Sequence, residues 1–304
     1  MRRTRHGLAS GLVLTVVVLV VRAPAGHAAP PEQLTIAIFA PSLEFTTTAR
    51  LSYLNQVADA IEAKTGIPTI ARSFVKYSDL AGAKPDFAIV EAQCIAARGP
   101  GTALATATIN GARTTDWGLY SRAKGQTLLE LRAKKVAYVK TGCRDSDFLD
   151  HALLLGVFRH DSFFSATVAK ADAPGAVVGT RDSGDADAVV APSRLATGLS
   201  LVVVIDAVPN PGLVVMNDKL DATLIAAARA AVVGTSGGPI GGWADAAGYD
   251  SLAGRMAGRK KPLVLAEPKP VEVSEPAAIR APIAAVHTVA THLLWQPPMK
   301  RARP

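Results

Sequence analysis

The chain has 304 residues, 49% of them hydrophobic, two cysteines and a formal net charge of +8. The charge lies at the ends: residues 1–29 hold four basic residues and no acidic one, and residues 259–304 hold eight basic and three acidic residues. Residues 30–258 hold 21 basic and 22 acidic residues. A nucleic-acid-binding protein requires a basic face, so a nearly neutral body excludes this class.

Residues 1–29 have the pattern of a cleavable secretory signal peptide. Three arginines within the first five residues precede an apolar run at 11–21, and small residues follow at 25–29. The run is shorter than the roughly 20 residues that span a bilayer. We therefore expect cleavage near Ala28 or Ala29 and localisation of the mature protein in the periplasm.

Residues 33–98 alternate between short apolar runs and helical patterns. Between the first two runs, apolar residues recur at helical spacing from Leu51 to Ile61, and Gly66 is a typical helix stop. The predicted strands are 34–40, 68–74 and 86–92, and the predicted helices are 45–65, 78–83 and 93–98. This alternation indicates a mostly parallel sheet covered by helices.

Two later segments are predicted to cross between two lobes. Residues 102–123 are strand-like on both sides of an Asn-Gly turn signal, and the apolar residues 199–217 are interrupted by two prolines. A second α/β unit lies between them, with strands at 135–140 and 184–192. After the second crossing segment, helices are predicted at 219–233 and 243–255.

The predicted fold class is therefore α/β, with two α/β lobes joined by two crossing strands and a ligand cleft between them. We assign residues 30–112 and 206–258 to lobe 1 and residues 113–205 to lobe 2. Residues 259–304 form a Pro-rich tail that we expect to be disordered.

The turn at residues 141–147, with the sequence TGCRDSD, has two interpretations. A turn before a helix is a natural seat for an anion because the first helical N–H groups lack partners. Alternatively, Asp145 or Ser146 simply caps a helix that buries Phe148, Leu149, Ala152 and Leu153.

The two cysteines, Cys94 and Cys143, leave their state open. In an oxidising compartment they could form a disulfide or stay separate thiols, and the sequence does not give their distance. They lack histidines at zinc spacing, so no metal site is predicted. No sequence motif links His151 or His160 to either cysteine as a catalytic pair. We therefore predict neither a catalytic residue nor a cofactor.

The order of segments resembles the phosphate/phosphonate class of periplasmic solute-binding proteins of ABC importers. The resemblance covers about residues 33–255. It rests on these segments of the sequence: IAIFAPSLEF, VADAIEAKTGIP, YSDLAGAKPDFAIVEA, TLLELRAKKVAYVKTG, GDADAVVAP, where Asp187 matches an acidic position of the family, and VPNPGLVV.

The resemblance implies two hinged α/β lobes that close around a ligand. It places the ligand at the loop after the first strand, the loop after the third, and the helix start in the second lobe. The implied ligand-binding residues are Pro41, Ser42, Glu91, Thr141, Cys143, Arg144 and Ser146. Relatives often carry a Ser-rich turn at this helix, whereas this chain has one Arg and two Asp there.

The predicted function is a monomeric solute-binding protein that delivers a small ligand to a membrane transporter. The first ligand class is a phosphonate-like or other small polar anion. The alternative is an apolar cargo such as a lipid or sterol, because the serine turn is missing and Cys143 stands in its place. A periplasmic enzyme is a third possibility. The sequence shows no nucleophilic side chain with a general base at a recognisable spacing, so we predict a protein that is not an enzyme.

Overall fold

A computed structural model describes residues 31–99 and 103–258 of the chain. The predicted signal peptide and the predicted tail lie outside the described residues. No helix within the described residues is long and apolar enough to cross a membrane.

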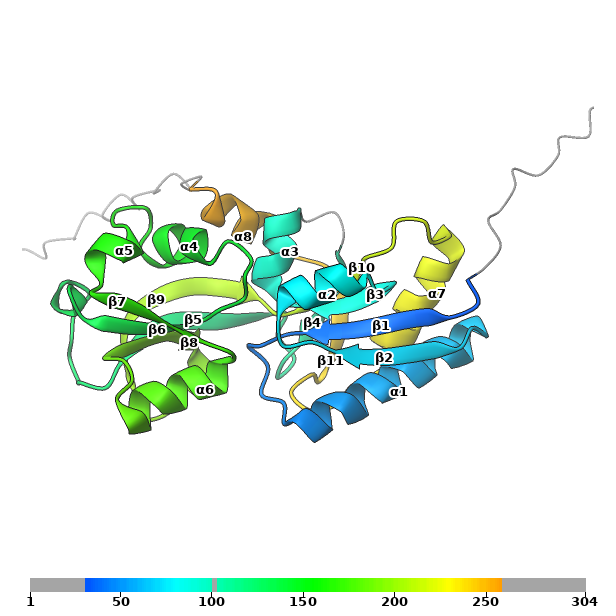
Figure 1. Ribbon diagram of the computed structural model, residues 1–304, viewed down its shortest axis with the longest axis horizontal. Coiled ribbons are helices and arrows are strands. Elements are labelled where there is room, and N and C mark those ends of the chain that lie inside the picture. Colours follow the sequence, from blue (N-terminus) through cyan, green and yellow to red (C-terminus); the bar gives the residue numbers. More distant parts are fainter. Residues whose placement is uncertain (1–30, 100–102, 259–304) are drawn as a thin grey trace, which may run out of the picture. The chain divides into compact units, whose positions relative to one another are not determined.

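The first sheet has six strands in the order β11-β4-β10-β3-β1-β2 (Figure 1). Its strands are β1 (Leu34–Phe39), β2 (Thr69–Ser73), β3 (Phe87–Val90), β4 (Ala103–Thr108), β10 (Gly212–Val215) and β11 (Gly242–Asp245). Its helices are α1 (Thr47–Thr65), α2 (Tyr77–Ala83), α3 (Ala92–Arg98) and α7 (Ala222–Val233). We call this sheet with its helices lobe 1.

The second sheet has five strands in the order β7-β6-β8-β5-β9. Its strands are β5 (Thr114–Ser121), β6 (Lys135–Val139), β7 (Ala166–Lys170), β8 (Ala188–Pro192) and β9 (Ser200–Pro209). The helical segments of this part are η2 (Leu129–Leu131), α4 (Asp145–Asp147), η3 (Phe148–Leu153), α5 (His160–Phe163), α6 (Ala173–Val178), η4 (Gly179–Ser183) and η5 (Ser193–Leu195). We call this sheet with its helices lobe 2, and the exact residue bounds of both lobes stay a prediction.

The structure confirms a two-lobe α/β fold and corrects two details. Both sheets are mixed rather than mostly parallel, because β10 and β11 pair antiparallel in the first and β9 pairs antiparallel with β5 in the second. The predicted helix at 243–255 is wrong in its first part. Residues 242–245 form β11, whose backbone pairs with the edge of β4, and only α8 (Tyr249–Met256) is helical.

Alternation along β1 sends its side chains to two different hydrophobic cores. Leu34, Ile36 and Ile38 pack in a core that includes buried residues of α1 and α7. Ala37 and Phe39 face the opposite side, in a core with α2 and α3. Because both faces of β1 are buried, its sequence is an almost continuous apolar run.

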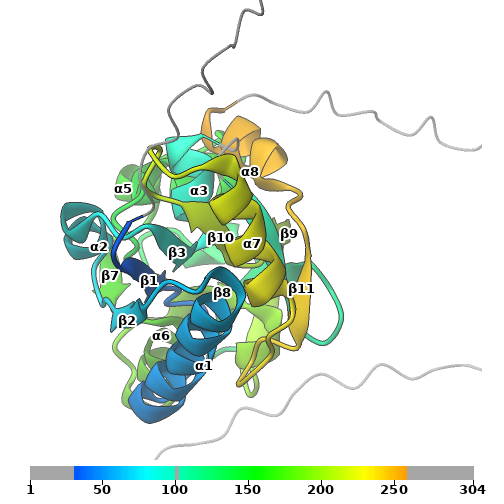
Figure 2. The ribbon, with the colours of Figure 1, turned by 90° about the vertical axis from the view of Figure 1, so that its right-hand side faces the viewer.

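The core on the α3 side does not stop at the edge of lobe 1. The same cluster of buried side chains contains Phe39 and Ile95 of lobe 1 and Leu119, Phe148 and Val190 of lobe 2. Helix α8 contributes to this cluster and packs on both α3 and η3. Figures 1 and 2 show α8, in orange, beside α3 in both views. The two lobes therefore share one apolar core.

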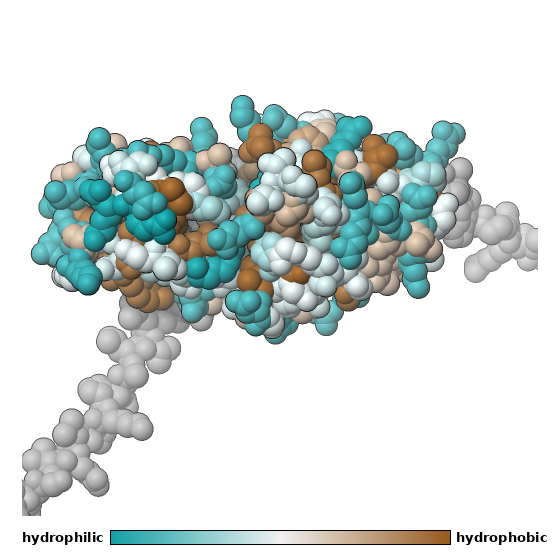
Figure 3. All heavy atoms as spheres, turned by 90° about the horizontal axis from the view of Figure 1, so that it is seen from below, coloured by the Kyte–Doolittle hydropathy of each residue, from teal (hydrophilic) through white to brown (hydrophobic). Residues whose placement is uncertain are grey.

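Most of the large apolar side chains are used in these cores. On the face drawn in Figure 3, hydrophobic residues appear as several patches among hydrophilic ones. Those that stay exposed in lobe 2 include Leu155, Val157, Leu201 and Val204. The high hydrophobic content thus mainly reflects three buried clusters.

Asn210 connects the two segments that cross between the sheets. Its side-chain amide donates to the carbonyls of Ala107 (3.1 Å) and Ala112 (2.9 Å), and its oxygen accepts from the Thr115 hydroxyl (2.6 Å). Its own carbonyl accepts from the Tyr249 hydroxyl at 3.0 Å. Asn210 is only 2% exposed, so each of these bonds replaces water in the crossing region.

Next to Asn210, the chain leaves no room for a side chain at position 212. A Cβ atom on Gly212 would lie 2.3 Å from the Tyr249 hydroxyl and 2.9 Å from the Ala105 carbonyl oxygen. Glycine at position 212 therefore lets β10 pass closely beside β4 and beside Tyr249 of α8.

We expect Asn210→Ala to lower the free energy of unfolding by about 3 kcal/mol, because it removes three side-chain hydrogen bonds, to Ala107, Ala112 and Thr115, each with a net value of about 1 kcal/mol. Urea denaturation measures this. Asn55→Ala is the control, since Asn55 is exposed on α1 and its loss should change stability by less than about 0.5 kcal/mol. Equal stability of the two variants would contradict the role of Asn210.

Candidate functional site

The loops that follow β1, β3 and β6 meet where the two lobes touch. Pro41 and Ser42 follow β1, Glu91 and Gln93 follow β3, and Thr141 follows β6. In α/β folds, ligands bind beyond the carboxyl ends of strands, and here such ends from both sheets supply the residues of one junction. We take this junction as the candidate site.

Two hydrogen bonds join the loop after β1 to lobe 2. The Pro41 carbonyl accepts from the backbone N–H of Ala173 at 2.9 Å, at the start of α6. The Ser42 carbonyl accepts from the Arg194 guanidinium at 2.7 Å. The predicted residues Pro41 and Ser42 therefore lie at the boundary of the lobes, where they contact lobe 2.

Glu91 is a buried acid at the start of α3. Its carboxylate accepts from the backbone N–H groups of Ser42 (3.1 Å) and Ala92 (3.3 Å). Burial raises the pKa of this carboxyl, and the Ser42 hydrogen bonds and the positive charge of Arg194 partly oppose that rise. Burial also lowers the pKa of Arg194, which Glu91 and Glu44 oppose. Glu91 and Arg194 thus attract each other electrostatically across the junction.

Cys94 and Cys143 form a disulfide that joins α3 of lobe 1 to the turn after β6 in lobe 2. Their Cα atoms are 4.9 Å apart, and both residues are buried. The bond settles the state of the cysteines that the sequence left open. It also means that neither sulfur is a free thiol, so Cys143 contacts the site as half of a disulfide.

The turn at 141–145 surrounds its own carboxylate. Asp145 Oδ1 accepts from the Thr141 hydroxyl (2.6 Å), the Thr141 backbone N–H (3.2 Å) and the side-chain amide of Gln93 (2.8 Å). Asp145 Oδ2 accepts from the Gly142 N–H at 3.0 Å. Gly142 has φ 73°, a left-handed conformation that suits glycine. We call these four donors the Asp145 cradle.

The capping interpretation of this turn is wrong, and the anion seat stays a prediction. No side chain caps α4, so Asp145 and Ser146 are not helix caps. The carboxylate of Asp145 instead bonds N–H groups that precede it. Arg144 lies outside the cradle, with a largely exposed side chain paired to Asp147 at 2.5 Å. Ser146 is exposed as well. The junction therefore brings together Pro41, Ser42, Glu91, Thr141 and Cys143, but not Arg144 or Ser146.

A small pocket lies beside the Asp145 cradle. Its walls are mostly apolar and come from β5, β6, β8 and η3, with Gln93 as the contribution of lobe 1. The aromatic walls are Trp117, Tyr138 and Phe148, and the Trp117 and Phe148 rings meet edge to face at 5.8 Å. The volume of the pocket that is open to the centre of a water molecule is about 10 Å³. This is about the volume that one water needs.

The pocket carries negative charge at one end. Within the part of the chain that the structure describes, Asp145 makes no ion pair, and its hydrogen-bond donors are all neutral groups. Burial raises the pKa of the neighbouring Tyr138, and the charge of Asp145 raises it further. The site thus combines aromatic walls with an uncompensated carboxylate.

Sequence reasoning missed Gln93 and Arg194, which make the main side-chain hydrogen bonds across the junction. Gln93 lies two residues after Glu91, on the same helical turn, and this proximity could have identified it. Arg194 follows β8 in η5. Nothing in its sequence context distinguishes it from a surface arginine, because its partner is a backbone carbonyl far away in the chain.

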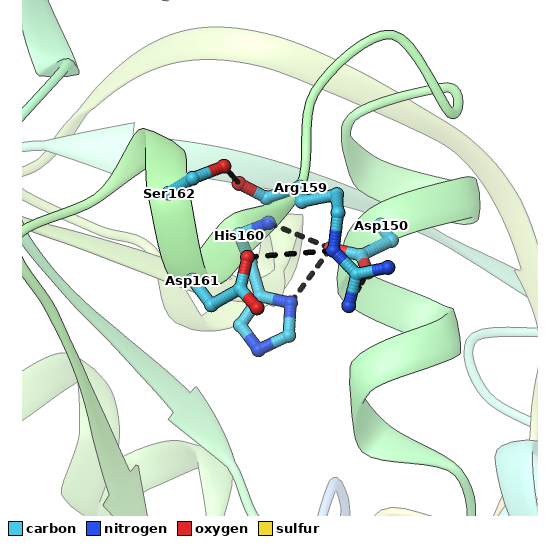
Figure 4. A network of polar contacts seen from close by, with 5 residues as sticks. All are labelled: Asp150, Arg159, His160, Asp161 and Ser162. Carbon is cyan, nitrogen blue, oxygen red and sulfur yellow. Dashed lines mark hydrogen bonds and ion pairs between the residues drawn. The ribbon is translucent and has the colours of Figure 1, made fainter.

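An Asp–His pair lies in lobe 2, and Figure 4 shows its arrangement. Asp150 accepts from the backbone N–H of His160 and contacts its ring Nδ1, both at 2.6 Å. The hydroxyl of Ser162 donates to the Arg159 carbonyl at 3.2 Å rather than to the histidine ring. The pair therefore ties η3 to α5, and among the described contacts no serine or cysteine completes a catalytic triad.

Comparisons with known proteins show the fold. No family model and no curated protein matches the chain. The structure is similar to a binding protein component of an ABC phosphonate transporter from Pseudomonas aeruginosa, with TM-score 0.55, 13% identity, and coverage of 72% of this chain and 83% of that one. PhnD1 from Prochlorococcus marinus, in complex with methylphosphonate, gives TM-score 0.57, 9% identity, and coverage of 75% and 99%.

A third similar structure is a Xanthomonas citri protein bound to ATP, with TM-score 0.57, 12% identity, and coverage of 75% of this chain and 97% of that one. The first two of these neighbours are phosphonate-transport or phosphonate-bound proteins by their descriptions. The chain therefore has the two-lobe fold of periplasmic solute-binding proteins. At these identities the similarity shows the fold alone.

We expect the double variant Cys94→Ser, Cys143→Ser to lose about 2 to 4 kcal/mol of unfolding free energy, because the disulfide closes a loop with a sequence separation of 49 residues. It should also lose hydrogen-exchange protection at Gly142 and Cys143. The control is wild type treated with reductant, which should match the variant. Unchanged stability would contradict a constraint at the junction.

We expect burial of Glu91 to lower the stability of the folded state as pH rises. Its pKa is above the ordinary 4.5, so between these two values the unfolded chain has released a proton that the folded protein still holds. The penalty is absent below pH 4.5 and complete above the raised pKa. Glu91→Gln should therefore gain stability relative to wild type as pH rises through this window.

Urea denaturation of both proteins from pH 3 to pH 8 measures this difference. Glu130→Gln is a matched control of opposite sign, because hydrogen bonds from Thr127 lower the pKa of Glu130. A constant stability difference between Glu91→Gln and wild type would show that the buried carboxyl does not titrate as described.

Proposed function

We propose that the protein is a periplasmic solute-binding protein that holds a small ligand between its two lobes and delivers it to an ABC-type membrane transporter. The observation that carries the proposal is the junction itself, where the ends of β1, β3 and β6 place hydrogen-bonding residues of both lobes in contact. The phosphonate-transport neighbours support the same role.

For the ligand class, the walls of the pocket favour an apolar cargo over a small polar anion. Trp117, Tyr138 and Phe148, together with aliphatic side chains, line the pocket, and Asp145 supplies negative charge. No Lys or Arg side chain lines it. An anion would therefore meet apolar walls and a like charge, whereas an apolar molecule gains by leaving water.

Ligand entry requires side chains to move, because the pocket now has room for about one water. The disulfide fixes α3 against the turn at 141–144, so a wide separation of the lobes at that point is excluded while the bond is intact. The contacts free to change are the noncovalent ones, Pro41 with Ala173 and Ser42 with Arg194.

We expect native mass spectrometry of the mature protein, purified from its own host, to reveal a bound organic molecule that solvent extraction releases. Trp117→Ala should retain at least tenfold less of it. Truncating a buried aromatic contact removes about 1.4 kcal/mol or more of binding free energy, and 1.4 kcal/mol corresponds to a tenfold loss of affinity. Phe158→Ala is the control, because Phe158 is an aromatic residue of lobe 2 that does not line the pocket. A bound phosphate or phosphonate would contradict the ligand class.

A further inference from the structure

The Asp145 cradle gathers donors from both lobes around a single carboxylate. Thr141 and Gly142 belong to the turn after β6, and Gln93 reaches across from α3. The residues Thr141 and Gln93 are only 4% and 7% exposed. Buried donors of this kind are costly to leave unpaired, so the cradle needs an oxygen acceptor at its centre.

The same donors would suit the oxygens of a small oxyanion. A carboxylate, phosphate or phosphonate accepts hydrogen bonds at the distances found here, 2.6 to 3.2 Å. The cradle differs from a free binding site only because Asp145, held three and four residues from its backbone donors, already fills it.

We propose that Asp145 is a specificity-determining residue that occupies the place of an oxyanion and thereby makes the junction reject oxyanions. This inference rests on the proposed function in taking the junction as the ligand site. Because Asp145 is part of the same turn, its carboxylate is present at a high effective concentration, which a free anion at millimolar level does not displace. Its charge also repels the competitor.

The negative charge of Asp145 has a consequence for the ligand. The group of the ligand that lies next to Asp145 is neutral or positively charged, since an anion there would be buried against a carboxylate with no cationic partner among the described residues. Asp147 does not share this role, because it is paired with Arg144 outside the pocket.

The test replaces Asp145 and supplies anions directly. Wild type, Asp145→Ala and the matched control Asp147→Ala, all with the disulfide intact, are titrated with acetate, inorganic phosphate and methylphosphonate by calorimetry and thermal melting. We expect Asp145→Ala to melt about 5 °C lower than wild type without anion and to recover with anion, because binding to the folded state stabilises it. We expect at least tenfold tighter binding of one of the three anions to Asp145→Ala than to wild type or Asp147→Ala.

Two outcomes would overturn the inference: wild type binds methylphosphonate or phosphate as tightly as Asp145→Ala, or folded Asp145→Ala binds none of the three anions. If Asp145→Ala does not fold, Asp145→Ser is titrated in its place, and tight binding of phosphate or methylphosphonate by wild type overturns the inference by itself. Supplied anions test the cradle without the host ligand. A failure here is therefore distinct from the absence of a bound molecule in the host-purified protein.

Discussion

The covalent bond between Cys94 and Cys143 is the constraint on which the arrangement of the site depends. It fixes the first turn of α3 against the turn after β6, and Gln93, the neighbour of Cys94, thereby reaches both the Cys143 carbonyl and Asp145. Without this bond, the amide of Gln93 would have to stay in place by two hydrogen bonds alone, each with a net value of about 1 kcal/mol. The disulfide therefore preorganises the polar part of the junction.

The apolar core that the lobes share opposes their separation, as the disulfide does. One buried cluster contains side chains of both lobes and of α8, so moving the lobes apart exposes apolar surface to water. At the other side of the junction, the contacts of Pro41 and Ser42 with lobe 2 are single hydrogen bonds. The lobes are therefore held together by a disulfide and by apolar contacts along α3, but only by single hydrogen bonds along the loop after β1.

Local patterns in the sequence were sufficient for β1, α1 and β3 of lobe 1, because these elements have clear apolar patterns and a glycine stop follows α1. They were insufficient where pairing partners decide the structure. Residues 242–245 become a strand because the edge of β4 is available to pair with them. Sequence patterns did not identify β7 and α6, because these elements follow a segment with weak apolar periodicity. For the site, the sequence located Glu91 and Thr141 at strand ends. It could not show that Asp145 turns back onto Thr141 and Gly142, because a carboxylate in a turn can bond forwards or backwards along the chain.

Under the proposed function, the acids of the junction, Glu91 and Asp145, give a fold shared with phosphonate-transport proteins a different ligand chemistry. Backbone N–H groups at the ends of strands are available in this fold whatever the side chains are, and they attract negative charge. In this chain the carboxylates of Glu91 and Asp145 accept from those groups at Ser42, Ala92, Thr141 and Gly142. The attraction for anions is therefore satisfied internally, and what remains open beside it is an aromatic wall with negative charge at its edge. Selectivity in such a site follows from which residues fill the donors, and the fold only places them.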